Sequence, residues 1–470
     1  MGIARSTRAS GGVWSNWAGN QRCAPAAVEH PRSEGELADL VKRAAVDGRT
    51  VKTVGAGHSF TDIACTTGVQ VQLDGYDRLL SIDRDRNRVT VEAGITIADL
   101  NRRLADEGLA MPNLGDIAYQ TISGAISTAT HGTGAKLGGI ATQVRGLSLV
   151  TADGSVLSCS ADQEPDVFKA ACVGLGALGI LSTVTLECVP AFNLHAVEEP
   201  MRLDKVLDEL DELVDGNDHF EFFYVPHTGW ALTKRNNRTS EPVSGYPRWK
   251  EFYEKILMEN VAFGLVNRIA RWRPQWTPKL AKALPSTGRT EYVKPSHLTF
   301  ASPRFVHFYE MEYNVPRSEA AGVVRRVRQF IDSSGLMISF PIEVRFTAPD
   351  DIWLSTANQR ESCYVAVHVY QRTQHEQYFR GVEAIMDEVG GRPHWGKMHY
   401  QTAATLRPRY AHWDDFQAVR RRLDPDGRFA NAYTDRVLGR RRGLGRVGRV
   451  DGPGDALGGV VDGEAEGPAG

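Results

Sequence analysis

The stretch Val54-Gly55-Ala56-Gly57-His58-Ser59-Phe60-Thr61-Asp62 decides how this chain is organised. A β-branched run at residues 50–54 precedes it and predicts a strand that ends in a tight loop. Gly55 and Gly57 let the backbone bend, adopt positive φ and approach a ligand closely. Their N–H groups can then face phosphate oxygens, as in other anion-binding turns. His58 stands between this bend and the ring of Phe60.

These glycines match only the first part of the dinucleotide fingerprint G-x-G-x-x-G. Phe60 occupies the third glycine position, and no clean helical pattern follows, which argues against a nicotinamide-dependent Rossmann enzyme. From this stretch alone, a glycine turn with an incidental histidine stays open. A second polar stretch that contains glycines, SGAISTATHGTG at residues 123–134, favours the ligand-binding interpretation.

Composition sets the broad class of the protein. The 470 residues suffice for two or three domains, and the formal net charge of -2 gives no nucleic-acid footprint. Six cysteines without a C-x-x-C pair argue against a zinc site and a disulfide scaffold, and they favour a reducing compartment. Residues 1–12 lack the apolar core of a secretory signal, and no run of about 18 apolar residues predicts a membrane span. We therefore expect a cytoplasmic protein, with peripheral membrane contact left open.

The pattern of predicted elements gives an α+β fold class and four segments. Residues 13–190 combine short strands with helices at 33–47 and 96–107 and a hairpin that turns at 153–154. Residues 191–391 alternate strands with helices, including helices at 203–214, 318–331 and 376–389, and predict a sheet covered by helices on one face. Residues 392–438 close the chain, and 439–470 read as a disordered tail. We expect Trp14 to begin an exposed aromatic cover and residues 240–300 to be the least regular part.

Two predicted strands of the second domain carry polar groups on one face. In residues 340–346, Glu343 and Arg345 alternate with apolar neighbours, and in residues 364–370, His368 does the same. If these strands are neighbours, the three polar side chains line one pocket. A carboxylate, a guanidinium and an imidazole there suit hydroxyl binding, charge stabilisation and proton transfer. The alternative is a solvated ion pair on an exposed sheet face.

Lys397 is a fourth candidate, because it follows the tight bend at Trp395-Gly396. Its alternative is an ordinary surface lysine. We expect no metal site, because His394, His399 and His412 lack further ligands at a suitable spacing. No G-x-S-x-G elbow occurs, which argues against a serine hydrolase.

Taken in order, the motifs resemble those of the aldonolactone oxidoreductases, the L-gulono-1,4-lactone and D-arabinono-1,4-lactone oxidases, of the vanillyl-alcohol-oxidase type of FAD flavoproteins. The resemblance runs from about Trp14 to Leu438 and is carried by NWA at 16–18, GAGHS at 55–59, GLAMPNLG at 108–115, THGTG at 130–134, EVR at 343–345 and RPHWGK at 392–397. It implies a PCMH-type FAD-binding domain at 13–190, a substrate-binding cap domain at 191–391 with an antiparallel sheet covered by helices, and a C-terminal return at 392–438.

The resemblance also implies functional residues. His58 is the position at which the family attaches FAD covalently. The positions expected to hold FAD are Gly55, Ala56, Gly57, His58, Ser59, Phe60, Asp116, Thr121, Ser123, Gly124, Thr128, His131, Gly134 and Ile180. Glu343, Arg345, His368 and Lys397 are the expected catalytic residues, with Glu343 orienting the substrate, Arg345 and Lys397 holding charge, and His368 acting as base. Asp116 is a serine in related alditol oxidases, and this departure weighs against a polyol pocket.

The expected reaction is hydride transfer from the C2 carbon of a sugar-1,4-lactone to flavin N5. Its 2-keto product tautomerises to an ascorbate-type enediol. Gly115 lies where the family controls oxygen access, and its missing Cβ favours O2 as acceptor with H2O2 as product. A cytochrome or quinone acceptor, an alditol oxidase acting on xylitol or sorbitol, and a flavin-binding protein without turnover are the alternatives.

Overall fold

The computed structural model describes residues 12–244, 263–283, 288–300 and 306–440, and all structural statements below concern these residues. The expected tail beyond residue 440 lies outside them. Every helix in the described part falls short of the length and apolarity that crossing a bilayer requires.

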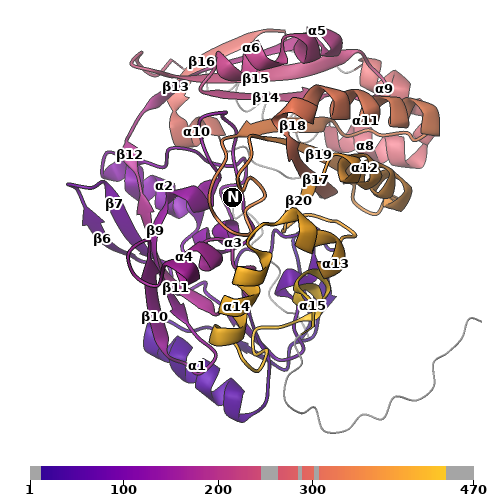
Figure 1. Ribbon diagram of the computed structural model, residues 1–470. Coiled ribbons are helices and arrows are strands. Elements are labelled where there is room, and N and C mark those ends of the chain that lie inside the picture. Colours follow the sequence, from indigo (N-terminus) through magenta and orange to yellow (C-terminus); the bar gives the residue numbers. More distant parts are fainter. Residues whose placement is uncertain (1–11, 245–262, 284–287, 301–305, 441–470) are drawn as a thin grey trace, which may run out of the picture.

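The first part of the chain builds a three-stranded parallel sheet, in the order β3-β5-β4, and a five-stranded antiparallel sheet, in the order β10-β9-β11-β7-β6 (Figure 1). Its elements are β1 (Trp14–Ser15), β2 (Arg22–Cys23), β3 (Ala27–Glu29), α1 (Glu34–Val46), β4 (Val51–Val54), the 3₁₀ turn η1 (Asp62–Ala64), β5 (Val69–Gln72), β6 (Leu79–Asp83), β7 (Arg88–Glu92), α2 (Ile97–Asp106), β8 (Leu109–Ala110), α3 (Ile122–Ser127), η2 (Ile140–Gln143), β9 (Val144–Val150), β10 (Val156–Ser160), α4 (Pro165–Ala171), β11 (Ile180–Glu187) and β12 (Val189–Pro190).

The second part forms an eight-stranded antiparallel sheet in the order β16-β13-β15-β14-β18-β19-β17-β20. Its elements are β13 (Asn193–Arg202), α5 (Leu203–Asp208), α6 (Leu210–Asp215), β14 (His219–Tyr224), β15 (Trp230–Thr239), α8 (Phe263–Trp272), η4 (Pro274–Trp276), α9 (Thr277–Ala283), β16 (Thr290–Pro295), α10 (Ser296–Phe300), β17 (Phe308–Pro316), η5 (Arg317–Glu319), α11 (Ala320–Ser334), β18 (Ile342–Thr347), β19 (Ser362–Tyr370), α12 (Glu376–Glu388) and β20 (Arg392–Pro393). Helices α5, α6, α11 and α12 cover its outer face (Figure 1).

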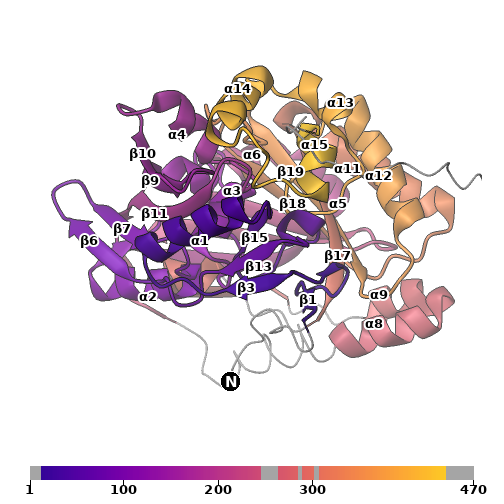
Figure 2. The same cartoon turned by 90° about the horizontal axis from the view of Figure 1, so that it is seen from below.

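The last segment returns to the first part of the structure. It comprises α13 (Ala403–Leu406), η6 (Arg407–Arg409), α14 (Trp413–Leu423) and α15 (Ala432–Leu438). Helix α14 packs against α4, and α15 packs against η1 (Figure 2). Apolar residues of this segment, including Phe416 and Tyr433, join the hydrophobic core built by the first 190 residues.

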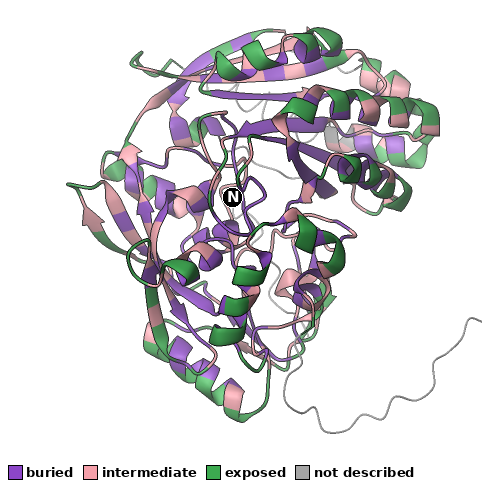
Figure 3. Cartoon of the chain, in the orientation of Figure 1, coloured by how far each residue is buried: buried purple, intermediate pink, exposed green. Residues whose placement is uncertain are grey.

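The period of two along the central strands of the eight-stranded sheet separates an apolar face from a polar face. On β18, Ile342, Val344 and Phe346 enter the core beneath the helices, and Glu343 and Arg345 point to the other face. Strands β18 and β19 pair directly, so the neighbouring strands expected from the sequence are confirmed. The polar face is nevertheless buried, because the first part of the chain covers it (Figure 3).

The structure corrects several sequence expectations. Trp14 is 1% exposed rather than part of an exposed cover. The helix expected at 203–214 is two short helices, because the chain leaves helical geometry at Glu209 (φ -99°, ψ 18°). The helix expected at 318–331 begins only at Ala320, because Ser318 lies inside the turn η5 and does not cap it. The described part of 240–300 contains the regular elements α8, α9, β16 and α10.

One side chain connects the C-terminal return to the loop after His58. The Asn431 Nδ2 group donates to the carbonyl oxygens of Asp62, Ile63 and Cys65 at 3.0, 3.0 and 2.9 Å. Its Oδ1 atom accepts from the N–H of Thr434 at 3.0 Å and so caps α15.

Replacing Asn431 tests whether these donors stabilise the fold. Asn431→Ala removes a cap worth about 1 kcal/mol and the two amide N–H groups, whose hydrogen bonds are worth about 1 kcal/mol each, so we expect a loss of roughly 3 kcal/mol. Asn431→Asp keeps the cap but turns a carboxylate toward three carbonyl oxygens, and its thermal midpoint should fall at least as far. The control is Ser33→Ala, which removes only the cap of α1. Equal midpoints for wild type and Asn431→Asp would show that the donors are unimportant.

Candidate active site

The loop after β4 forms one wall of a cleft of about 1000 Å³. Strand β4 ends at Val54, and the backbone of the glycine loop then runs beside the start of α3. Of the positions expected to hold FAD, the cleft is lined by Gly55, Ala56, Gly57, His58, Ser59, Thr121, Ser123, Gly124 and Thr128. Its lining is rich in glycine backbone and hydroxyl groups, which suits a phosphate-bearing dinucleotide.

Gly55 and Gly57 are required in the loop for different structural reasons. Gly57 has φ 69°, in the left-handed region that favours glycine. Gly55 does not, but a Cβ there would lie 2.2 Å from the Thr121 hydroxyl oxygen, so only glycine lets the loop approach α3 so closely.

The remaining positions expected to hold FAD lie elsewhere. Asp116 and His131 line a second cavity, which is described below. Phe60 is buried in an aromatic cluster and donates its backbone N–H to the Gly396 carbonyl oxygen at 2.7 Å. Gly134 donates its N–H to the Phe346 carbonyl oxygen at 2.7 Å, away from both cavities. Ile180 is buried at the start of β11, next to the cleft residue Gly179.

His58 has the properties of an attachment point for a group bound in this cleft. Its Nδ1 atom is buried and has no hydrogen-bond partner among the described residues. Burial, together with the charges of Lys397 and His307, lowers the pKa of His58 to about 4. The imidazole is therefore neutral at pH 7 and keeps a nucleophilic nitrogen. Trp17 covers the ring, with a centroid distance of 5.4 Å.

A second cavity of about 860 Å³ lies between the loop at 115–117 and the polar face of the eight-stranded sheet. Gln120 lines both cavities and so connects them. The four expected catalytic residues all line the second cavity: Glu343, Arg345, His368 and Lys397. The structure therefore brings together side chains from β18, β19 and the segment after β20 that are up to 54 positions apart.

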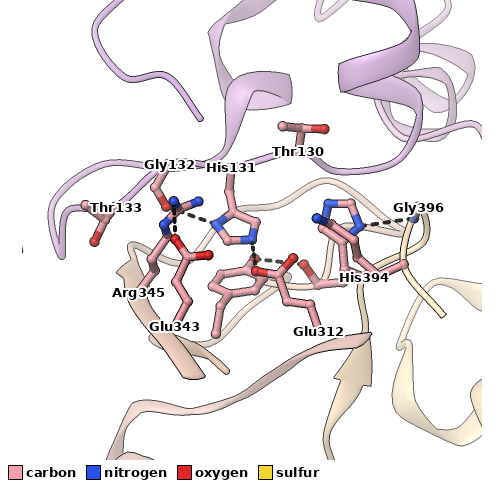
Figure 4. Close-up of polar contacts among 12 residues, drawn as sticks. Thr130, His131, Gly132, Thr133, Glu312, Glu343, Arg345, His394 and Gly396 are labelled. Atoms are coloured by element: carbon pink, nitrogen blue, oxygen red, sulfur yellow. Dashed lines mark hydrogen bonds and ion pairs between the residues drawn. The ribbon is translucent and has the colours of Figure 1, made fainter. Parts of the chain in front are cut away.

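Arg345 is surrounded by three carboxylates from three segments. It pairs with Asp116 of the loop at 115–117 and with Glu221 of β14, at 2.8 Å between Nε and Oε2. It also pairs with Glu343 of its own strand (Figure 4). Burial alone would lower the pKa of Arg345, but Asp116, Glu343 and Glu221 outweigh it and raise the pKa well above the usual value. Arg345 is therefore a buried cation that stays protonated. The alternative of a solvated ion pair on an exposed sheet face is excluded.

Lys397 is also buried and paired. Its Nζ atom lies 2.5 Å from Glu310 Oε2 and 5.2 Å from the centroid of the Phe60 ring. Burial lowers the pKa of Lys397, but Glu310 and Glu312 overcome this effect and raise it. Glu310 itself keeps a pKa of about 2, because Lys397 and His368 offset the burial of its carboxylate. The surface-lysine alternative is therefore excluded.

His368 is held in an orientation that suits a base. Its Nδ1 atom lies 3.2 Å from the Pro341 carbonyl oxygen, which can only accept a hydrogen bond. The neutral ring therefore carries its proton on Nδ1 and keeps a lone pair on Nε2. Glu310 lies 3.5 Å from Nε2, beyond a good hydrogen bond, and can stabilise positive charge once Nε2 is protonated.

His131 faces acceptors with both ring nitrogens. Nδ1 lies 2.9 Å from the Gly132 carbonyl oxygen and Nε2 lies 3.0 Å from Glu312 (Figure 4). The charge of His131 helps to hold the pKa of Glu312 well below its usual value despite burial. A carboxylate and a carbonyl both accept hydrogen bonds, so they hold the ring of His131 from both sides, and the ring stacks on Tyr364 at a centroid distance of 3.5 Å.

Sequence reasoning missed Glu221, Glu310, Glu312 and His394, which also surround the second cavity or its cations. The signal was present, because Glu310 and Glu312 alternate with apolar residues along β17 as Glu343 and Arg345 do along β18. Three groups of potential metal ligands occur here, for example Glu310, Glu343 and His368, but Arg345 and Lys397 already neutralise these carboxylates. Of the three histidines considered from the sequence, His394 lies in one of these groups, whereas His399 contacts the Tyr433 hydroxyl at 3.2 Å.

Comparisons with known proteins agree with this arrangement. The profile of the D-arabinono-1,4-lactone oxidase family matches residues 184–437, and an FAD binding domain profile matches residues 25–160. A solved structure named solvent-stable cholesterol oxidase superposes with a TM-score of 0.78 at 16% identity, covering 90% of this chain and 97% of that one. This likeness shows a shared fold.

Three curated relatives cover nearly the whole chain. An L-gulono-1,4-lactone dehydrogenase of Mycobacterium tuberculosis is 48% identical, covering 91% of this chain and 99% of its own. An L-gulonolactone oxidase of Bos taurus is 35% identical, covering 90% and 98%. An alditol oxidase of a Streptomyces species is 31% identical, also covering 90% and 98%. The expected family and α+β fold are confirmed: the chain belongs to the D-arabinono-1,4-lactone oxidase family and is an FAD-linked oxidoreductase.

Proposed function

We propose that this enzyme oxidises the C2 hydroxyl of an aldono-1,4-lactone, with L-gulono-1,4-lactone and D-arabinono-1,4-lactone as the candidate substrates. One observation carries the proposal: a buried wall with His368, Arg345 and Lys397 lines a cavity that shares Gln120 with the cleft fitted for FAD. The names of the M. tuberculosis and B. taurus relatives support the lactone class. The product is a 2-keto lactone, which tautomerises to an enediol.

FAD, when bound, supplies the hydride acceptor. The chain provides the proton chemistry and the charges. His368 Nε2 takes the hydroxyl proton, while the Pro341 carbonyl fixes the tautomer and Glu310 stabilises the resulting imidazolium. Arg345 and Lys397 stabilise negative charge that develops in the cavity, since they remain protonated throughout the physiological pH range. Glu343, held against Arg345, orients the substrate hydroxyl.

We further propose that FAD is bound covalently through His58. The unpartnered, neutral Nδ1 atom in the cleft supports this attachment.

The proposed electron acceptor is O2, which gives H2O2. Gly115 lines the substrate cavity without a side chain, and a Cβ there would lie 2.9 Å from the His131 carbonyl oxygen. A specific observation favours a second candidate, because the M. tuberculosis relative is named a dehydrogenase. In that case a cytochrome or quinone takes the electrons.

Alditol oxidation is the other alternative, supported by the name of the Streptomyces relative. The lactone remains the better candidate, because Asp116 is engaged by Arg345 at the cavity wall where alditol oxidases are expected to carry serine. A direct assay with polyols and lactones as substrates distinguishes these two functions.

A substrate panel under anaerobic conditions tests the function. We expect the yellow absorbance near the visible maximum of the flavin to bleach with an aldono-1,4-lactone and not with xylitol or sorbitol. Admitting air should then restore the colour within seconds. If xylitol alone bleaches the flavin, the enzyme is an alditol oxidase. If the colour returns only after cytochrome c or a quinone is added, the enzyme is a dehydrogenase.

Acid precipitation tests the attachment. The wild-type pellet should keep its yellow colour, since a covalent bond survives denaturation of the protein. His58→Ala should release the pigment into the supernatant, and His30→Ala, at an exposed histidine paired with Asp74, is the control. A colourless wild-type pellet would refute the covalent bond and leave the fold assignment intact.

Replacing His368 tests the proposed base. His368→Gln should lower kcat by about 10²- to 10⁴-fold, the usual contribution of a positioned base, while the visible spectrum of bound FAD stays unchanged. The matched control is His195→Gln, an exposed histidine paired with Glu291. Arg345→Ala would be a poorer test, because it would leave three carboxylates without their opposite charge and would destabilise the protein. Unchanged turnover in His368→Gln would remove the residue from the mechanism.

A further inference from the structure

Two cysteines outside the active site lie beside one another. Cys23 ends β2, and Cys65 directly follows η1 in the segment that leaves the His58 loop. Both are half-buried free thiols, and Cys23 is close enough to raise the pKa of the Cys65 thiol. The reaction described above uses neither.

The backbone explains why the two thiols meet. Strands β3 and β5 are parallel, and Ala27 pairs with Val69, 42 positions later. Cys65 also stands 42 positions after Cys23, so the two segments that lead into the paired strands bring the cysteines near one another. The N–H of Ala26 donates to the Gly68 carbonyl oxygen at 2.8 Å and continues the alignment toward them. Neighbouring strands lie about 4.8 Å apart, within the Cα separation that a disulfide spans.

We propose that Cys23 and Cys65 are an oxidation site at which a reversible disulfide joins the N-terminal hairpin to the flavin-binding loop. With hydrogen peroxide as oxidant, the two S–H bonds and the O–O bond break, one S–S bond forms, and both oxygens leave as water. The two thiols lose two electrons, and the peroxide gains them. A thiol reductant reverses the change. The proposal holds whether or not the enzyme itself produces peroxide.

The bridge would hold two segments that contact the FAD cleft. On one side, Trp14 pairs with Cys23 across the β1–β2 hairpin and lines the cleft. In the same hairpin turn, the N–H of Trp17 donates to the Gly57 carbonyl oxygen at 2.8 Å. On the other side, the Cys65 carbonyl oxygen accepts from Asn431 at 2.9 Å. A disulfide between these segments would restrict the unfolded chain, so it should raise the thermal midpoint of the holoenzyme by several degrees.

The environment of Cys65 controls the rate at which the disulfide forms. Burial, and next the neighbouring Cys23 thiol with the carboxylate of Asp62, raises the pKa of Cys65. The thiolate is the reactive form, so bridge formation at neutral pH is slow and accelerates as the pH is raised.

Mass spectrometry of the holoenzyme tests the proposal. The protein is incubated with excess hydrogen peroxide, denatured and alkylated, and its thiols are counted before and after dithiothreitol. We expect the six alkylated thiols to fall to four, one cross-linked peptide pair to contain Cys23 and Cys65, and dithiothreitol to restore six. The thermal midpoint should rise on oxidation and return on reduction.

Variants separate this bridge from other oxidation. Cys23→Ser and Cys65→Ser should each keep five thiols and show no rise in midpoint, whereas Cys188→Ser, at a buried cysteine, should still lose two. Six surviving thiols in the wild type, a bridge between other cysteines, or a sulfinic acid on Cys65 without a bridge would each overturn the proposal. Because the wild-type peptide map alone can refute it, the test does not depend on whether the variants fold.

Discussion

The ion pairing of the Arg345 guanidinium is the interaction on which the second cavity depends. A buried cation is tolerated only when opposite charges compensate it, and here Asp116, Glu221 and Glu343 do so. These partners come from a loop of the FAD-binding part and from two strands of the cap sheet. The pairing therefore joins the two parts of the molecule and fixes one wall of the second cavity.

A second charge system works in the same way. Lys397 and His368 share Glu310, and His131 faces Glu312, both on β17. The strand presents its carboxylates two residues apart, so one strand face organises a lysine from the C-terminal return, a histidine from β19 and a histidine from the FAD-binding part. Each histidine also has a backbone carbonyl at its other nitrogen, which fixes the ring orientation before substrate arrives.

The sequence predicted the structure correctly where a local periodicity or an ordered series of motifs determines it. Alternation along residues 340–346 and 364–370 predicted the polar face, and Ser33 marked the start of α1 correctly. Local patterns failed where tertiary contacts decide: Trp14 is buried at the wall of the first cleft, and the residues around Glu209 do not predict the break in the helix. The carboxylate partners of the cations were missed, since pairing between distant strands is invisible in one chain.

The close approach of two loop segments has a consequence for altering this enzyme. A Cβ at Gly132 would lie 2.2 Å from the Leu114 carbonyl oxygen, just as one at Gly115 would press on His131. The two segments are therefore in close contact, and a larger residue at either glycine would displace the backbone that carries His131 beside Glu312. A change at position 115 therefore shifts the charged groups around Glu312 as well, whereas Phe223 and Phe340 line the second cavity from other segments of the chain.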